Sequence, residues 1–163
     1  MNLTTILEPG DVLLYRGTGV FSRLIQVKTW SKVSHCEGYV GQGQSVASRD
    51  GKGVGLYPLR VEGLCAILRP RGLFNLVVAM DWFKTVDKQG YDWFGLLAFF
   101  AARWQGSTNQ KMFCSEFLTR WQRKGDIEPF SPEYDADAVS PGMFLSSPVY
   151  TRIPLDASEK KAA

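Results

Sequence analysis

The feature that most constrains the fold is a change of sequence pattern at Pro70. Before it, short apolar runs are separated by glycine-containing turns such as GQGQ and RDGKG, which is typical of antiparallel strands. After it, apolar residues recur at the 3.6-residue spacing of helices. The sequence therefore predicts an α+β fold, with an antiparallel sheet early in the chain, packed against helices that come later.

The expected elements follow from turn and capping residues. We predict strands over residues 11–16, 34–40, 45–48, 54–59, 64–69 and 149–153, and helices over 20–30, 73–88, 92–104 and 113–124, with a proline-rich loop over 129–141. The 73–88 helix turns polar at Lys84, so its buried face should end near Phe83. No linker divides the chain, which predicts one domain over 1–156 and a flexible tail over 157–163.

Charge and hydropathy exclude several classes of protein. The 163 residues carry a net charge of +3, from 19 basic and 16 acidic residues, and the basic ones are scattered, which argues against a nucleic-acid partner. The longest uncharged apolar run, residues 93–102, is too short to span a bilayer, so no integral membrane segment is expected. The N-terminus does not resemble a signal peptide. We therefore expect a cytoplasmic protein.

Histidine and cysteine are scarce. The chain has one histidine, so a multi-histidine metal site is excluded, and its three cysteines form no CxxC pair, so zinc-finger spacing is absent. An odd number of widely spaced cysteines also argues against a disulfide framework. We expect no metal and no cofactor, and any imidazole chemistry must use His35.

Cys114 begins the predicted 113–124 helix. A helix N-terminus lowers the pKa of a thiol through its dipole and unpaired amide groups, which favours a nucleophilic thiolate. The backbone amides around Ser115 are candidate donors for an oxyanion hole. The alternative is that Cys114 is an ordinary buried thiol.

His35 begins the predicted strand over 34–40. Strand alternation places His35, Glu37 and Tyr39 on one face and Cys36 on the other, so His35 and Cys36 should point apart. Glu37 can then orient the His35 imidazole, as the third member of a nucleophile–base–orienter set. The alternative is a surface glutamate beside a structural histidine. Cys36 and Cys65 both lie on predicted strands with apolar neighbours, so we expect them to be core residues.

Taken together, these segments resemble the NlpC/P60 papain-like superfamily in its circularly permuted branch. The matching segments, in chain order, are GDVLLYRG (10–17), SHCEGYVGQGQSVAS (34–48), GVGLYPL (53–59), GYDWFGLL (90–97) and FCSEFL (113–118). The resemblance implies a histidine strand that precedes the cysteine helix, and His35 and Cys114 are 79 positions apart. It also implies that Tyr91 helps to stabilise an oxyanion, although covering a helix junction is an alternative role for this tyrosine.

One position departs from the family pattern. Many members carry a third, polar triad residue on the next strand, about twelve positions after the histidine, where this chain has Ala47. Ser48 should point to the opposite face of that strand, and Asp50 lies in a turn. Glu37 is our preferred substitute. A Cys–His dyad and an inactive descendant that serves as a binding module remain alternatives.

The resemblance implies a cysteine hydrolase that cleaves an amide bond, with peptides or peptidoglycan-like molecules as substrates and a phage-encoded origin as one route to them. The alternative enzyme is a thioesterase or acyltransferase acting on a lipid or acyl substrate. For that enzyme the aromatic residues between Phe94 and Trp104 would line a groove, although their helical spacing is more often typical of core.

Overall fold

The structure is a computed structural model that describes residues 3–88 and 112–155. A six-stranded sheet forms its centre, with the strand order β4-β3-β2-β1-β5-β6 and antiparallel pairing throughout. The strands are β1 (Val12–Tyr15), β2 (His35–Gly41), β3 (Gln44–Arg49), β4 (Gly53–Pro58), β5 (Leu64–Pro70) and β6 (Tyr150–Ile153). Each predicted strand is present, with ends that differ by at most one residue. The predicted α+β class is confirmed.

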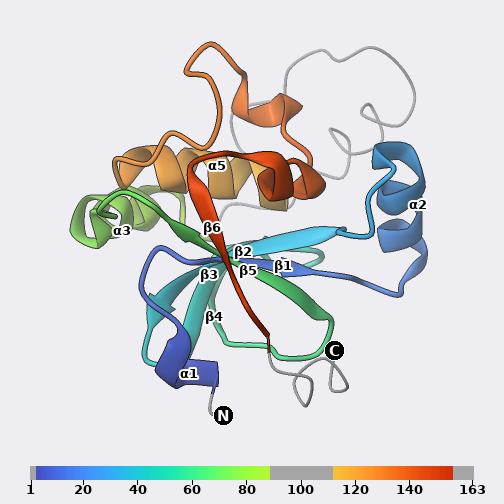
Figure 1. Ribbon diagram of the computed structural model, residues 1–163, viewed down its shortest axis with the longest axis horizontal. Coiled ribbons are helices and arrows are strands. Elements are labelled where there is room, and N and C mark those ends of the chain that lie inside the picture. Colours follow the sequence, from blue (N-terminus) through green and yellow to red (C-terminus); the bar gives the residue numbers. More distant parts are fainter. Residues whose placement is uncertain (1–2, 89–111, 156–163) are drawn as a thin grey trace.

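The helices differ in where they contact the sheet. They are α1 (Leu3–Ile6), α2 (Val20–Thr29), α3 (Leu76–Val86) and α5 (Cys114–Lys124), with short 3₁₀ helices η1 (Ala136–Ala138) and η2 (Pro141–Ser146). In Figure 1, α3 and α5 lie on one side of the sheet, α1 on the other, and α2 at the end where β2 begins. The predicted 92–104 helix and the tail over 157–163 lie outside the described residues.

The larger core lies between the sheet and helices α3 and α5. Val12, Leu14 and Cys36 face it from the strands, and Phe117 and Trp121 face it from α5. A second cluster, under α1, includes Leu13, Tyr15, Tyr39, Leu64 and Ile67. Neighbouring strand residues thus belong to opposite faces, as strand alternation requires.

Gly38 sets how closely β2 and α5 approach each other. A Cβ atom at this position would lie 2.3 Å from the Trp121 ring, which is far inside contact distance. The indole therefore packs directly on the β2 backbone. This contact fixes α5, whose first residue is Cys114, over the strand whose first residue is His35.

Helix α3 is shorter than its apolar pattern predicts. Asn75 caps it by accepting a hydrogen bond from the Val78 amide at 3.3 Å, so Leu73 precedes the helix and is exposed. The prediction that the buried face ends near Phe83 is wrong, because Val86 is also buried. No helix of the described residues is long and apolar enough to cross a membrane.

Candidate active site

Cys114 is the first residue of α5 and is buried against the sheet. Two hydroxyl groups fix the chain on either side of it. Ser48 on β3 donates a hydrogen bond to the Met112 carbonyl at 2.5 Å, and Ser115 donates one to the Val139 carbonyl at 2.5 Å. The predicted direction of Ser48, away from the histidine face, agrees with this contact. The head of α5 is therefore tied to β3 and to the loop that follows η1.

His35 and Cys114, 79 positions apart in sequence, interact directly by hydrogen bonding and by charge. Burial lowers the pKa of His35, but the charge on Cys114 and the hydrogen bonds to Cys114 and Glu37 outweigh this effect and raise it to about 9. The imidazole is therefore held in its protonated form near neutral pH.

Glu37 is the second partner of the His35 ring. The Nε2 atom of His35 donates to Oε1 of Glu37 at 3.0 Å, and the Glu37 side chain is fully buried. With Nε2 occupied in this way, Nδ1 is the ring nitrogen left for the Cys114 sulfur. The structure thus brings together the three residues proposed for catalysis on sequence grounds.

A buried carboxylate needs compensating partners, and Glu37 has several. Arg49 donates from Nε to Oε1 and from Nη2 to Oε2, each at 2.9 Å, and Ser45 donates to Oε2 at 2.6 Å. Burial raises the pKa of Glu37, but hydrogen bonds from His35, Arg49 and Ser45 reverse this effect and lower it to about 2. Glu37 is therefore a permanent anion beside the imidazole.

The strand register explains how Glu37 occupies this place. Gly38 pairs with Val46 and Tyr39 with Ser45, and continuing this antiparallel register by one residue sets Glu37 opposite Ala47. Cross-strand neighbours on one face lie about 5 Å apart. The Glu37 carboxylate therefore extends from β2 on the face where the small side chain of Ala47 leaves room.

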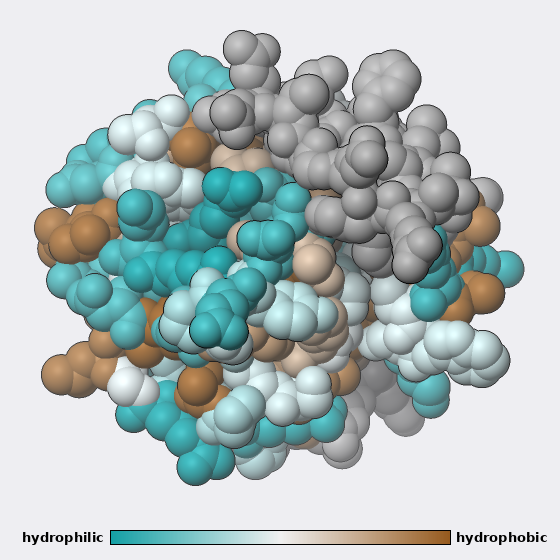
Figure 2. Space-filling model, turned by 90° about the horizontal axis from the view of Figure 1, so that it is seen from above, coloured by the Kyte–Doolittle hydropathy of each residue, from teal (hydrophilic) through white to brown (hydrophobic). Residues whose placement is uncertain are grey.

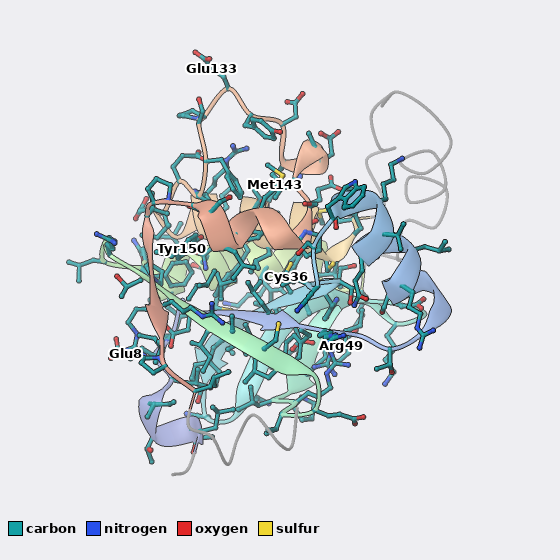
Figure 3. All side chains as sticks on the ribbon, turned by 45° about the vertical axis from the view of Figure 1, so that its right-hand side comes forward. Glu8, Cys36, Arg49, Glu133, Met143 and Tyr150 are labelled. Atoms are coloured by element: carbon teal, nitrogen blue, oxygen red, sulfur yellow. The ribbon has the colours of Figure 1, made fainter. Side chains whose placement is uncertain are left out.

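Cys36 was expected to be a core residue only, but it also interacts with the Cys114 thiol. The Cys36 thiol forms a hydrogen bond with Cys114 from the helix side of the sheet, and this is the largest influence on the pKa of Cys114, followed by burial and then the charge of His35. The net effect holds the pKa of Cys114 well below its usual range, while burial raises the pKa of Cys36. Figure 3 shows Cys36 on the helix side of the sheet and Arg49 on the other side.

The remaining sequence candidates fall into three groups. The Ser115 hydroxyl is buried and donates to Val139, so its backbone amide is the part left for substrate. Tyr91 and the aromatic residues over 93–104 lie outside the described residues. Cys65 is half-buried, and its Sγ donates to the Leu14 carbonyl at 3.3 Å, in agreement with its expected packing role.

Three site residues were not expected from the sequence: Ser45, Arg49 and Cys36. Ser45 and Arg49 lie two positions before and after Ala47, so strand alternation places them on its face, and this spacing was the available signal. Cys36 carried no such signal, because alternation separates it from His35 and only the path of α5 brings both to Cys114.

A hollow of about 300 Å³ lies on the far side of Tyr15 from the reacting groups, and neither His35 nor Cys114 is part of its lining. Its lining includes Tyr15, Arg16, Gly17, Arg60 and Glu62. The centroid of the Tyr15 ring lies 5.9 Å from that of the His35 ring. The Arg60 guanidinium stacks on the Tyr15 ring, 4.5 Å from its centroid. The hollow offers space for a part of a substrate that is remote from the reacting groups.

Comparison with known proteins shows the fold alone. No family model and no curated protein matches the chain. Among solved structures, the crystal structure of YiiX from Escherichia coli O157:H7, described as a metalloprotein (DUF1105), has a TM-score of 0.69 and 16% sequence identity, over 91% of this chain and 97% of that one. This chain therefore shares the architecture of YiiX. Within residues 3–88 and 112–155, no group of three or more histidine, cysteine, aspartate or glutamate side chains could hold a metal ion.

Proposed function

We propose that the protein is a cysteine hydrolase of the circularly permuted NlpC/P60 type, which cleaves an amide bond with Cys114 as nucleophile and His35 as base. One observation carries the proposal: His35 has both Cys114 and the buried Glu37 carboxylate as partners, with a contact of 3.0 Å from its Nε2 atom to Glu37. A carboxylate on the far ring nitrogen fixes the imidazole in the orientation that serves a nucleophile. The order of the histidine strand and the cysteine helix along the chain is consistent with it.

The groups present are sufficient for acyl transfer. The Cys114 thiolate attacks the carbonyl carbon, and the His35 imidazolium donates its proton to the leaving amine as the carbon–nitrogen bond breaks. Water then attacks the thioester, His35 accepts its proton, and the thiolate leaves. Backbone amides at Cys114 and Ser115 are the proposed donors to the oxyanion, at the start of α5.

The substrate class follows from the family resemblance and is a peptide or a peptidoglycan-like molecule. The hollow behind Tyr15 is the proposed site for a part of the substrate that is remote from the scissile bond. Its two arginines, Arg16 and Arg60, give it excess positive charge over Glu62, which suits a substrate with an acidic group.

Alkylation of the cysteines tests the proposal without knowledge of the substrate. Iodoacetamide at pH 7, followed by peptide mass mapping, compares Cys114 with Cys36 and Cys65 in the same molecule. We expect Cys114 to react at least about tenfold faster, because the other two thiols have raised pKa values. His35→Ala should remove part of this advantage, because the charge and hydrogen bond of His35 also lower the pKa of Cys114.

A second measurement tests acyl transfer itself. Incubation with activated acyl esters should give a protein whose mass increases by one acyl group, attached at Cys114 and absent in Cys114→Ala. Equal alkylation of the three thiols, together with no acyl adduct, would overturn the proposal and favour a binding module of the same fold.

A further inference from the structure

Two apolar residues of helix α2, Leu24 and Val27, face solvent instead of the core. Leu24 is 46% exposed and Val27 is 75% exposed, whereas Ile25 is buried on the opposite side. At about 100° per residue, Leu24 and Val27 point within about 60° of each other. A helix of a globular protein normally directs such a stripe inward, so this outward stripe needs an explanation.

Trp30 extends the exposed apolar surface at the end of the helix. It is 97% exposed and forms the C-cap of α2 in the left-handed conformation, with φ 50°. A left-handed conformation costs a residue with a Cβ atom roughly 1 kcal/mol, and glycine usually occupies such caps. The chain thus holds a large indole in solvent at a position where a small residue would be more stable.

The charged residues of α2 and of the loops on either side of it have one sign in sequence; the acidic Glu62, from another part of the chain, lines a hollow with Arg16 and Gly19 before α2 begins. Between Asp11 and Glu37 the chain has no acidic residue, and its four basic residues are Arg16, Arg23, Lys28 and Lys32, all exposed. Arg23 and Lys28 lie on either side of the Leu24–Val27 stripe, each about 40° beyond its edge. Figure 2 shows brown and teal surface next to each other at the end of the molecule that carries α2, on the right.

We propose that α2 and Trp30 form a docking surface for an anionic lipid bilayer. Apolar side chains with basic residues on both flanks and no acidic ones are the pattern of an interfacial helix, in which indole and aliphatic groups enter the headgroup boundary and the cations contact lipid phosphates. A second copy of the chain fits less well, because it would bring the two basic flanks against each other. His35 begins β2 five positions after Trp30, so docking would hold the site end of the sheet near the bilayer.

Flotation with vesicles tests the proposal and does not depend on catalysis. The wild-type protein should bind vesicles of 70% phosphatidylcholine and 30% phosphatidylserine, and bind pure phosphatidylcholine weakly. Rising salt should release it from the anionic vesicles, because salt screens the attraction between the basic residues and the lipid headgroups. Lys28→Glu/Lys32→Glu should weaken binding by about fivefold or more for each cation removed. Trp30→Ala should weaken it about tenfold.

The α3 end of the molecule supplies a matched control. Leu73 is 96% exposed and Val77 is 71% exposed, but Asp81 and Lys84 near them form an ion pair and give this surface mixed charge. Val77→Ser should bind vesicles like wild type. Trp30→Ala should keep the wild-type melting temperature, since it changes an exposed side chain. The double lysine variant places a negative charge in the last turn of α2, so its melting temperature is measured to show that it is folded in the binding experiment.

Two results would overturn the proposal. One is equal binding to neutral and anionic vesicles, or binding that both variants leave unchanged. The other is a wild-type protein that does not bind vesicles but forms a concentration-dependent dimer in sedimentation, together with a Trp30→Ala variant that is a monomer. The surface would then be an interface between two copies of the chain.

Discussion

Glu37 and Arg49 form a bidentate ion pair between neighbouring strands, in which Arg49 donates from Nε to Oε1 and from Nη2 to Oε2 of Glu37, each at 2.9 Å. The same Oε1 atom accepts the hydrogen bond from His35 at 3.0 Å. Arg49 therefore does two things for the site. It keeps a fully buried carboxylate ionised, and it fixes the plane of that carboxylate, which in turn fixes the imidazole.

Replacing Glu37 with glutamine should reduce acyl transfer by about 10²-fold, because the amide removes the charge that favours imidazolium and can present the wrong atom to Nε2. The His35 pKa should fall from about 9. Since the chain has one histidine, its imidazole signals in NMR can be followed without assignment.

Glu62→Gln is the control for this experiment. Glu62 lines the hollow that also contains Tyr15 and Arg60, but it is exposed, and no contact between it and His35 is found among the described residues. It should leave the histidine titration unchanged. A Glu37→Gln protein with wild-type rates and an unchanged His35 pKa would assign Glu37 a structural role only.

The pH dependence of Cys114 alkylation should form a plateau across neutral pH. On the acid side the rate should rise well below the ordinary thiol range, because the Cys36 hydrogen bond and the His35 charge lower the pKa of Cys114. On the alkaline side the alkylation rate should depart from the plateau near pH 9, where His35 loses its proton and the ion pair with the thiolate is lost. A single rise at the pKa of a free thiol would contradict the ion pair.

Cys36 should act as a positioning residue for the nucleophile. Cys36→Ala removes the hydrogen bond to Cys114, so the acid limb of the alkylation profile should move to higher pH. Cys36→Ser keeps a donor and should restore part of the shift. Cys65→Ser is the matched control, since Cys65 bonds the Leu14 carbonyl and should leave the profile unchanged. If all three variants give one profile, Cys36 only fills space.

Stability should depend on pH in opposite senses through two site residues. The pKa of Glu37 is lowered to about 2, so its contribution, roughly 3 kcal/mol, is present above its ordinary value near 4.5 and is lost as pH falls toward 2. The pKa of His35 is raised to about 9, so its contribution is present below about 6.5 and is lost as pH rises through 9.

Urea midpoints measured from pH 2 to 10 check this dependence. The urea midpoint of the wild-type protein should be highest between about pH 4.5 and 6.5, where both contributions are complete. Glu37→Gln should flatten the acid side and lower the midpoint near neutrality. A variant that keeps the full acid dependence would show that other carboxylates cause it.

Much of the fold could be predicted from the sequence, because local patterns determine it. Glycine turns and period-2 runs located the strands, and Cys114 could be placed at a helix start from the pattern of FCSEFL. The direction of α2 could not be predicted in this way. Leu24 and Ile25 are both apolar residues at helical spacing, yet Ile25 is buried and Leu24 is exposed, and only the tertiary arrangement distinguishes them.

The site was predictable where it lies within one strand. His35 and Glu37 are two positions apart, so alternation alone places them on one face. The Arg49 contact required the β2–β3 register, and the Cys36 contact required the height of α5 over the sheet, which the Gly38–Trp121 packing sets. These are long-range properties that no local pattern encodes.

The carboxylate should be transferable from β2 to β3. Glu37→Ala removes the anion and leaves space opposite residue 47, and Ala47→Glu returns a carboxylate from the neighbouring strand, between Ser45 and Arg49 on the same face. Because the register places the two positions side by side, the double variant should recover about tenfold of the activity that Glu37→Ala loses. Ala47→Glu alone should lower the melting temperature, since it sets two buried carboxylates against each other. A double variant that folds like wild type but is no more active than Glu37→Ala would show that the imidazole is oriented through the β2 backbone geometry of Glu37, and that a charge on that face does not suffice.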